Sequence, residues 1–119
     1  MREERGQLTG DLVISEPYTL WGKIAGNITV VDGGKLYVRG SVFGDLTVEA
    51  GGRVHVLGNV KGRLIVMPKA KVIVGGVIGH DVINRGGRVY IEHTAKIIGK
   101  VKTKLDGETT FETKKGKGD

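Results

Sequence analysis

The sequence contains no cysteine, which excludes disulfide bonds, thiolate metal sites and thiol nucleophiles. Aromatic residues make up only 5% of the chain, so few large side chains are available to line a broad ligand pocket. No apolar run approaches the roughly 20 residues that span a bilayer, and residues 1–6 (MREERG) lack the apolar region of a signal peptide. We therefore expect a cytoplasmic protein, either free or peripheral to the inner face of the cell membrane.

Glycine is abundant instead, with 21 residues against two prolines, and valine and isoleucine dominate the apolar content. This composition favours short strands joined by tight turns. The net charge of +6 is compatible with an anionic partner or with an ordinary mixed surface. The sequence carries no recognition helix, aromatic ribonucleoprotein motif or phosphate-binding loop, so no specific nucleic-acid binding is predicted.

Aliphatic residues recur every six positions through most of the chain. This period matches neither the 3.6-residue turn of an α-helix nor the two-residue alternation of a flat strand, and internal repeats of this kind indicate a solenoid. The ten residues that keep the period without interruption are predicted to fill the core: Ile24, Val30, Leu36, Val42, Val48, Val54, Val60, Val66, Val72 and Ile78.

A longer period of eighteen residues is superimposed on the six, because small residues recur in columns such as Gly26, Gly44 and Gly62. Three sixes per coil predict a three-sided winding, with one short strand and one corner on each side. Leu46 and Val48 alternate with polar neighbours, as a pleated strand requires. The sequence therefore predicts an all-β, single-stranded parallel β-helix with about 18 residues per coil. Periodicity alone does not fix its hand, and we expect it to be right-handed.

Two interruptions of the period mark irregular coils. The step from Leu20 to Ile24 is four residues, which predicts a first coil shortened by two residues. The period later returns in a shifted phase at Ile91, and we attribute the shift to one extra residue within Asn84–Arg88.

These limits predict about five coils in a domain spanning residues 8–105. Residues 1–7 are expected to form a short charged N-terminal tail, and residues 106–119 a flexible C-terminal tail. The C-terminal tail is rich in lysine and is a candidate for weak contact with an anionic membrane or polymer. Its lysines are Lys114, Lys115 and Lys117.

Both ends of a short β-helix expose strand edges and an open apolar core. Exposed edges pair readily with another chain, and no long amphipathic helix is present in the sequence to cover either end. We therefore expect the chain to associate with itself end to end, as a homopolymer or homo-oligomer. The residues expected at these contacts are Leu8, Leu12, Ile14, Tyr18, Leu20, Trp21, Ile91, Ile97, Ile98 and Val101.

Short phrases recur within the coils. Residues 40–46 read GSVFGDL, residues 58–64 read GNVKGRL and residues 26–28 read GNI. These phrases resemble the G-x-V-x-G-D-I repeats of the bactofilins, a family of polymer-forming bacterial cytoskeletal proteins. Residues 89–99 (VYIEHTAKIIG) keep the frame of the family's C-terminal coil, L-x-I-E-x-G-A-x-F-x-G, with Thr94 and Ile97 as substitutions.

The resemblance implies a right-handed triangular β-helix that forms filaments without nucleotide. It also implies a non-enzymatic scaffolding role, with other cytoskeletal or wall-remodelling proteins as partners. Two other classes stay open. Hexapeptide acyltransferases build a left-handed β-helix on the same six-residue step, although their loop with a catalytic histidine has no counterpart here. A β-helix that binds a partner on one flat face, without polymerising, is the second.

The polar residues give no clear sign of chemistry. His55 follows a core valine and is expected to face solvent, whereas His80 adjoins Asp81, which can orient an imidazole for general-base catalysis. No nucleophile accompanies this pair, and the three histidines lack metal-ligand spacing. Aspartate and asparagine beside glycine are typical of turns. We therefore expect no catalytic, cofactor or metal site.

Overall fold

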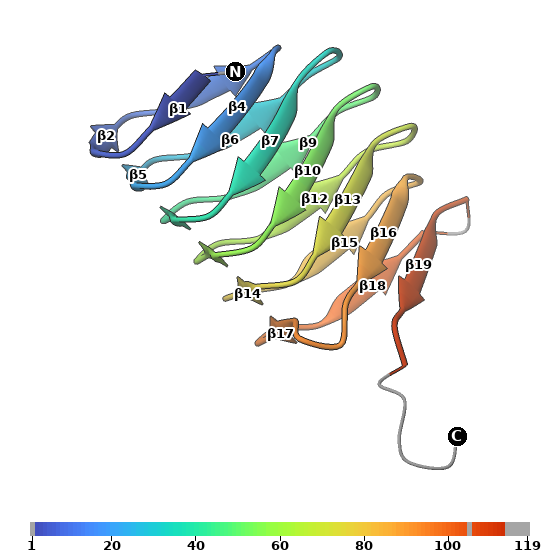
Figure 1. The fold of residues 1–119 in the computed structure, drawn as a ribbon. Helices are drawn as coiled ribbons and strands as arrows, with labels where there is room; N and C mark the ends of the chain where they lie inside the picture. Colours follow the sequence, from blue (N-terminus) through green and yellow to red (C-terminus); the bar gives the residue numbers. More distant parts are fainter. Residues whose placement is uncertain (1, 105, 114–119) are drawn as a thin grey trace.

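The computed structural model describes residues 2–104 and 106–113 as short parallel strands stacked into a solenoid (Figure 1). Within these residues every regular element is a strand and none is a helix. The strands form three parallel sheets, and each complete coil contributes one strand to each sheet. The parallel β-helix predicted from the sequence is confirmed.

We name the sheets A, B and C. Among the described residues, sheet A contains β1 (Arg2–Glu4), β4 (Pro17–Leu20), β7 (Lys35–Val38), β10 (Arg53–Val56), β13 (Lys71–Val74), β16 (Arg88–Ile91) and β19 (Glu108–Phe111). Sheet B contains β2 (Gln7–Thr9), β5 (Lys23–Ala25), β8 (Ser41–Val42), β11 (Asn59–Val60), β14 (Val77–Ile78) and β17 (Lys96–Ile97). Sheet C contains β3 (Leu12–Ile14), β6 (Ile28–Val30), β9 (Leu46–Val48), β12 (Leu64–Val66), β15 (Val82–Asn84) and β18 (Val101–Thr103).

The central coils keep the eighteen-residue period, since Arg53 of β10 pairs with Lys35 of β7 and with Lys71 of β13. The described strands complete six coils, and β19 begins a seventh. The solenoid is therefore longer than the five coils expected from the sequence. The additional strands come from segments whose apolar pattern is weak, at both ends of the chain.

Each regular coil sends five residues into the core. In the third coil these are Leu36 and Val38 from sheet A, Val42 from sheet B, and Leu46 and Val48 from sheet C, all fully buried. The six-residue period marks three of the five and leaves out the other two, Val38 and Leu46. All ten residues of the predicted columns lie in the buried cluster. Each such side chain contributes about 1.5–3 kcal/mol when buried, and stacking of coils supplies that burial.

A column of aspartate and asparagine joins successive coils at the corner between sheets B and C. Asp11 Oδ1 accepts from the Asn27 amide at 2.9 Å, and Asn27 Oδ1 accepts from the Asp45 amide at 2.7 Å. Asp45 Oδ1 accepts in turn from the Arg63 amide at 2.7 Å, and Asp81 repeats the bond further along at 2.8 Å. These side chains satisfy backbone amides of the next coil at a corner, which gives them a structural role.

The first coil is two residues shorter than the others. Gln7 pairs with Lys23, sixteen residues later, whereas the central coils advance by eighteen. The missing residues belong to the corner between β3 and β4, where only Ser15 and Glu16 connect the strands. Residues 31–34 fill the same corner in the next coil. The predicted shortening is confirmed.

The position assigned to this deletion is wrong. The step of four residues from Leu20 to Ile24 also occurs between Val38 and Val42, in a coil of regular length, where all four residues are buried. Both steps cross the corner from sheet A to sheet B. In every regular coil, four residues separate the last buried residue of sheet A from the buried residue of sheet B, where the period would suggest six. The step of four therefore marks no irregularity.

The second interruption also differs from the expectation. Lys71 pairs with Arg88, seventeen residues later, so the corner that follows β15 is one residue shorter than its predecessor. The expected extra residue within Asn84–Arg88 is therefore wrong. The added residues lie beyond it, because residues 92–95 connect β16 to β17 where residues 75–76 suffice in the coil before.

The corner between sheets C and A requires a left-handed residue in each regular coil. Gly33, Gly51 and Gly86 have φ angles of 88°, 83° and 135° at this corner. Lys69 takes the equivalent place with φ 69°, and it is the one non-glycine residue with positive φ among the described residues. Glycine adopts this conformation without steric cost, whereas a side chain is strained there.

The structure extends the solenoid beyond both predicted limits. Within the expected N-terminal tail, Arg2–Glu4 forms β1, which pairs with β4. Within the expected C-terminal tail, Glu108–Phe111 forms β19, which pairs with β16. Both segments are polar, because the edge strand of a stack has fewer core contacts to make. The tail lysines at positions 114, 115 and 117 lie outside the described residues.

Candidate assembly surfaces at the two ends

Each end of the stack is formed by three edge strands. The N-terminal end presents β1, β2 and β3, and the C-terminal end presents β19, β17 and β18, which close the strand orders of sheets A, B and C. Figure 1 shows the two ends at opposite extremities of the solenoid. Each of these strands has a paired neighbour on one side only within the described chain. The other side carries backbone groups that can continue the ladder with another molecule.

The N-terminal end combines apolar and charged side chains. Leu8 and Leu12 are partly buried and pack against the core cluster, so they lie where the core opens. Ile14, Tyr18 and Leu20, also predicted as contacts, are at most 6% exposed and belong to the core. Of this predicted group, only Leu8 and Leu12 lie at the end surface.

Strand β1 covers the sheet A side of this end with charge. Arg2 and Glu4 occupy the positions that point inward in the other coils, because they pair with Tyr18 and Leu20. The Arg2 guanidinium lies 5.8 Å from the centre of the Tyr18 ring and 3.0 Å from a Glu16 carboxylate oxygen. Burial, assisted by the Glu4 carboxylate, raises the pKa of Tyr18 above its ordinary value.

Trp21 is a lateral feature and does not lie at an end. It follows β4 in the second coil, and its ring is held between the guanidinium groups of Arg5 and Arg39, each 4.8 Å from a ring centre. Trp21 is 40% exposed on the side of the solenoid. The two cation–π contacts link three successive coils.

The C-terminal end is more apolar. Ile97 and Val101, both predicted as contacts, are partly buried at the edge of the core. Phe111 pairs with Ile91 in the inward register of sheet A, yet it is 58% exposed because no further coil covers it within the described residues. Ile91 itself is 5% exposed and belongs to the core, whereas Ile98 is 59% exposed on the outside of the coil.

A buried asparagine attaches β19 to the coil below. Asn84 is fully buried, and its Nδ2 donates to the Glu108 carbonyl oxygen at 3.1 Å and to Thr109 Oγ1 at 3.0 Å. Its Oδ1 accepts from the amides of Gly86 at 3.1 Å and Gly87 at 2.8 Å. Asn84 breaks the apolar column in the sequence because its side chain serves these four partners.

Glu112 fastens the chain after β19. Its Oε1 accepts from the His93 amide at 2.9 Å and lies 2.8 Å from His93 Nδ1. The hydrogen bond from the His93 backbone amide, together with the one from the His93 imidazole, holds the pKa of Glu112 below its ordinary value. Burial and the Glu112 carboxylate raise the pKa of Tyr90, which lies beside this pair. The role of Glu112 was missed in the sequence, where residues 106–113 show no repeat.

The remaining histidines, His80 and His55, each lie beside a carboxylate. His80 Nδ1 accepts from the Asp81 amide at 2.9 Å, and the Lys100 amide bound to the Asp81 carboxylate lowers the pKa of Asp81. His55 Nε2 is buried without a hydrogen-bond partner, 3.7 Å from a Glu92 carboxylate oxygen. No group of three or more potential metal-binding side chains occurs among the described residues.

Comparisons with protein-family models, curated proteins and solved structures found no match to this chain. Among the described residues, no helix has the length and apolar character needed to cross a membrane.

Proposed function

We propose that this chain is a non-enzymatic, self-assembling structural protein, whose β-helices associate through their ends into a filament or scaffold similar to those of the bactofilins. The observation that supports the proposal most strongly is the state of the two ends. Each end consists of edge strands bordered by partly buried apolar residues, and the described chain provides no element that covers them.

A second molecule would cover both the strand edges and the open core at each end. Edge strands left unpaired are templates for pairing, and proteins that stay monomeric usually block them. Here Leu8 and Leu12 at one end, and Ile97 and Phe111 at the other, would become buried by a second molecule. An end-to-end contact that does not close into a ring propagates into a filament.

The charged side chains of β1 set a condition on this contact. Arg2 and Glu4 occupy inward positions at the N-terminal end and need polar partners or water in the assembled state. On the neighbouring strands β2 and β3, the corresponding core-facing residues are Leu8 and Leu12, which carry no charge. We therefore assign the larger share of the N-terminal contact to sheets B and C.

Sedimentation velocity of end variants tests the proposal. Leu12→Lys and Ile97→Lys place a charge at opposite ends and should convert large assemblies of the wild type into small species. Phe43→Lys is the matched control, because Phe43 is 45% exposed on the side of a central coil. This control should assemble like the wild type. Circular dichroism must show an intact fold in all three variants.

Two outcomes would contradict end-to-end assembly. Wild-type protein that stays monomeric at high concentration would refute self-association. Loss of assembly in Phe43→Lys, with Leu12→Lys and Ile97→Lys unaffected, would move the contact to the sides of the solenoid.

A further inference from the structure

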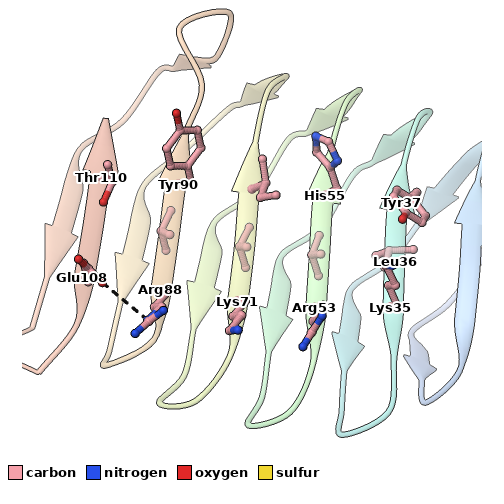
Figure 2. Close-up of a pocket in the computed structure, with 14 residues that line it drawn as sticks. Lys35, Leu36, Tyr37, Arg53, His55, Lys71, Arg88, Tyr90, Glu108 and Thr110 are labelled. Carbon is pink, nitrogen blue, oxygen red and sulfur yellow. Dashed lines mark ion pairs between the residues drawn. The ribbon is translucent and has the colours of Figure 1, made fainter. Parts of the chain in front are cut away.

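The outer face of sheet A carries four cationic side chains in one line, which we call the basic row. Lys35, Arg53, Lys71 and Arg88 occupy the same register position in β7, β10, β13 and β16. All four are exposed, each is the first residue of its strand, and Figure 2 shows them on neighbouring strands. Since neighbouring strands lie about 4.8 Å apart, the row presents one positive charge per coil over three consecutive steps.

A second row runs parallel to the basic row, two residues further along each strand. It contains Tyr37, His55, Ile73 and Tyr90, and we call it the aromatic row although Ile73 interrupts it. Ile73 and Tyr90 are each 39% exposed, and the Tyr37 and His55 ring centres lie 6.2 Å apart. The two rows line a shallow groove of about 500 Å³ that follows the solenoid axis (Figure 2).

Folding gives no reason for the basic row. Like charges directly opposite each other on adjacent strands destabilise a sheet. Glu108 lies 3.7 Å from Arg88 at one end of the row, and Lys35 lies 5.5 Å from the centre of the Tyr37 ring. Within the described residues, Arg53 and Lys71 have no acidic partner within ion-pair distance. An anionic ligand along the row would remove the repulsion.

The described residues offer no unbroken column of carboxylates that would match the basic row. Among the described residues, Asp11, Asp45 and Asp81 share one column, but Asn27 and Arg63 interrupt it. These carboxylates also hold backbone amides. A second copy of this chain therefore does not match the basic row, and the ligand must be a different anion.

The side-by-side arrangement of charges and rings indicates the kind of anion. A single nucleic-acid strand carries phosphates along one side and planar bases along the other, and proteins bind it with a positive groove next to aromatic side chains. We propose that this face of sheet A binds single-stranded nucleic acid without sequence preference. The phosphates lie along the basic row and the bases lie against the aromatic row.

Fluorescence anisotropy with a labelled oligothymidylate tests the proposal. Four phosphate contacts predict that the logarithm of the binding constant falls with the logarithm of salt concentration with a slope of about −3. The double variant Arg53→Glu/Lys71→Glu should weaken binding by more than about tenfold and reduce the slope. Its matched control, Lys23→Glu/Lys61→Glu, has the same net charge with both changes at exposed positions in and after strands of sheet B. The control should bind within about twofold of the wild type.

Tyr90→Leu separates a nucleic acid from an anion without bases. It should weaken oligothymidylate binding by at least about fivefold, because one base loses the aromatic side chain on which it stacks. Binding of inorganic polyphosphate should not change in this variant.

Three results would overturn the proposal. They are failure of the wild type to bind the oligonucleotide, equal loss of binding in the two double variants, and unchanged oligonucleotide binding in Tyr90→Leu. Sedimentation with vesicles containing anionic lipid is run in parallel. If vesicles bind through the basic row and the oligonucleotide does not, the face is a membrane surface and the proposal is wrong.

Discussion

Replacement of Asn84 by valine tests whether β19 and the shortened corner depend on this side chain. Asn84 pairs in register with Val66, so Asn84→Val restores the apolar column and looks stabilising in the sequence. In the structure the change removes all four hydrogen bonds of a fully buried side chain. The Gly87 amide, whose bond to Asn84 is buried, and the Glu108 carbonyl oxygen would then lose this partner.

The magnitude follows from these two groups. A buried donor or acceptor left without a partner costs about 1–3 kcal/mol, so the pair costs about 2–6 kcal/mol. Burial of two valine methyl groups returns about 1.6 kcal/mol. We therefore expect Asn84→Val to lower the free energy of unfolding by about 0.4–4.4 kcal/mol.

Urea unfolding followed by circular dichroism measures this difference. Thr109→Val is the control, because it removes the hydroxyl that accepts from Asn84 and contacts Thr103, while Asn84 keeps its bond to Glu108. It should cost about 0.5–1.5 kcal/mol, less than Asn84→Val. A stability of Asn84→Val equal to or above that of the wild type would refute the reasoning, since the column would then require only apolar volume.

Three further substitutions test separate features. Val54→Asp buries a charge in a position only 4% exposed and should unfold the chain, whereas the exposed Glu49→Lys should leave the melting curve unchanged; equal melting temperatures in circular dichroism would contradict the column assignment. The Arg63 amide lowers the pKa of Asp45, so the stability contributed by this carboxylate is present above its unfolded pKa of about 3.9 and is lost as pH falls through the lower folded value. Asp45→Asn keeps the acceptor, as Asn27 does one coil earlier, but loses the ionised form and its ion pair with Arg63, so it should be less stable than the wild type at neutral pH and lack that part of the acid sensitivity; Asp45→Ala should cost more, about 1–2 kcal/mol. Lys69→Gly relieves the left-handed backbone and should add about 0.5–1 kcal/mol in urea unfolding, and a loss of stability would show that the lysine makes a compensating contact.

The fold could be predicted because a stack of equal coils repeats the same environment. Three successive coils place Val42, Val60 and Ile78 in the same buried column of sheet B. The spacing of these residues in the sequence therefore equals the coil length. Counting in sixes nevertheless gave wrong positions for the irregular corners. The three sides are unequal in length, and strict counting in sixes overlooks Val38 and Leu46, which are also fully buried.

The ends could not be predicted in the same way. Strands β1 and β19 have a neighbouring coil on one side only, so their inward positions tolerate Arg2, Glu4 and Thr109. Side-chain hydrogen bonds from Asn84 and Glu112 fix the last strand, and such bonds leave no period in the sequence. As a result, Phe111 at the C-terminal end was not recognised as a candidate contact.

Part of the basic row on the outer face of sheet A, unlike the ends, can be recognised in the sequence. Lys35, Arg53 and Lys71 recur every eighteen residues and are visible in the sequence once the period is known. Arg88 follows Lys71 by only seventeen residues, because the corner before β16 is one residue shorter. Counting in eighteens therefore does not reveal that Arg88 aligns with them. The basic row therefore depends on the register that the structure provides.

Electron microscopy of the purified wild-type protein, combined with diffraction from its assemblies, tests end-to-end association most directly. End-to-end association predicts unbranched filaments with a repeat of about 4.8 Å along the filament axis, because stacking through the ends keeps the strands perpendicular to that axis. Monomers alone at high concentration would contradict it. So would filaments in which the 4.8 Å repeat runs across the axis, since the solenoids would then associate through their sides.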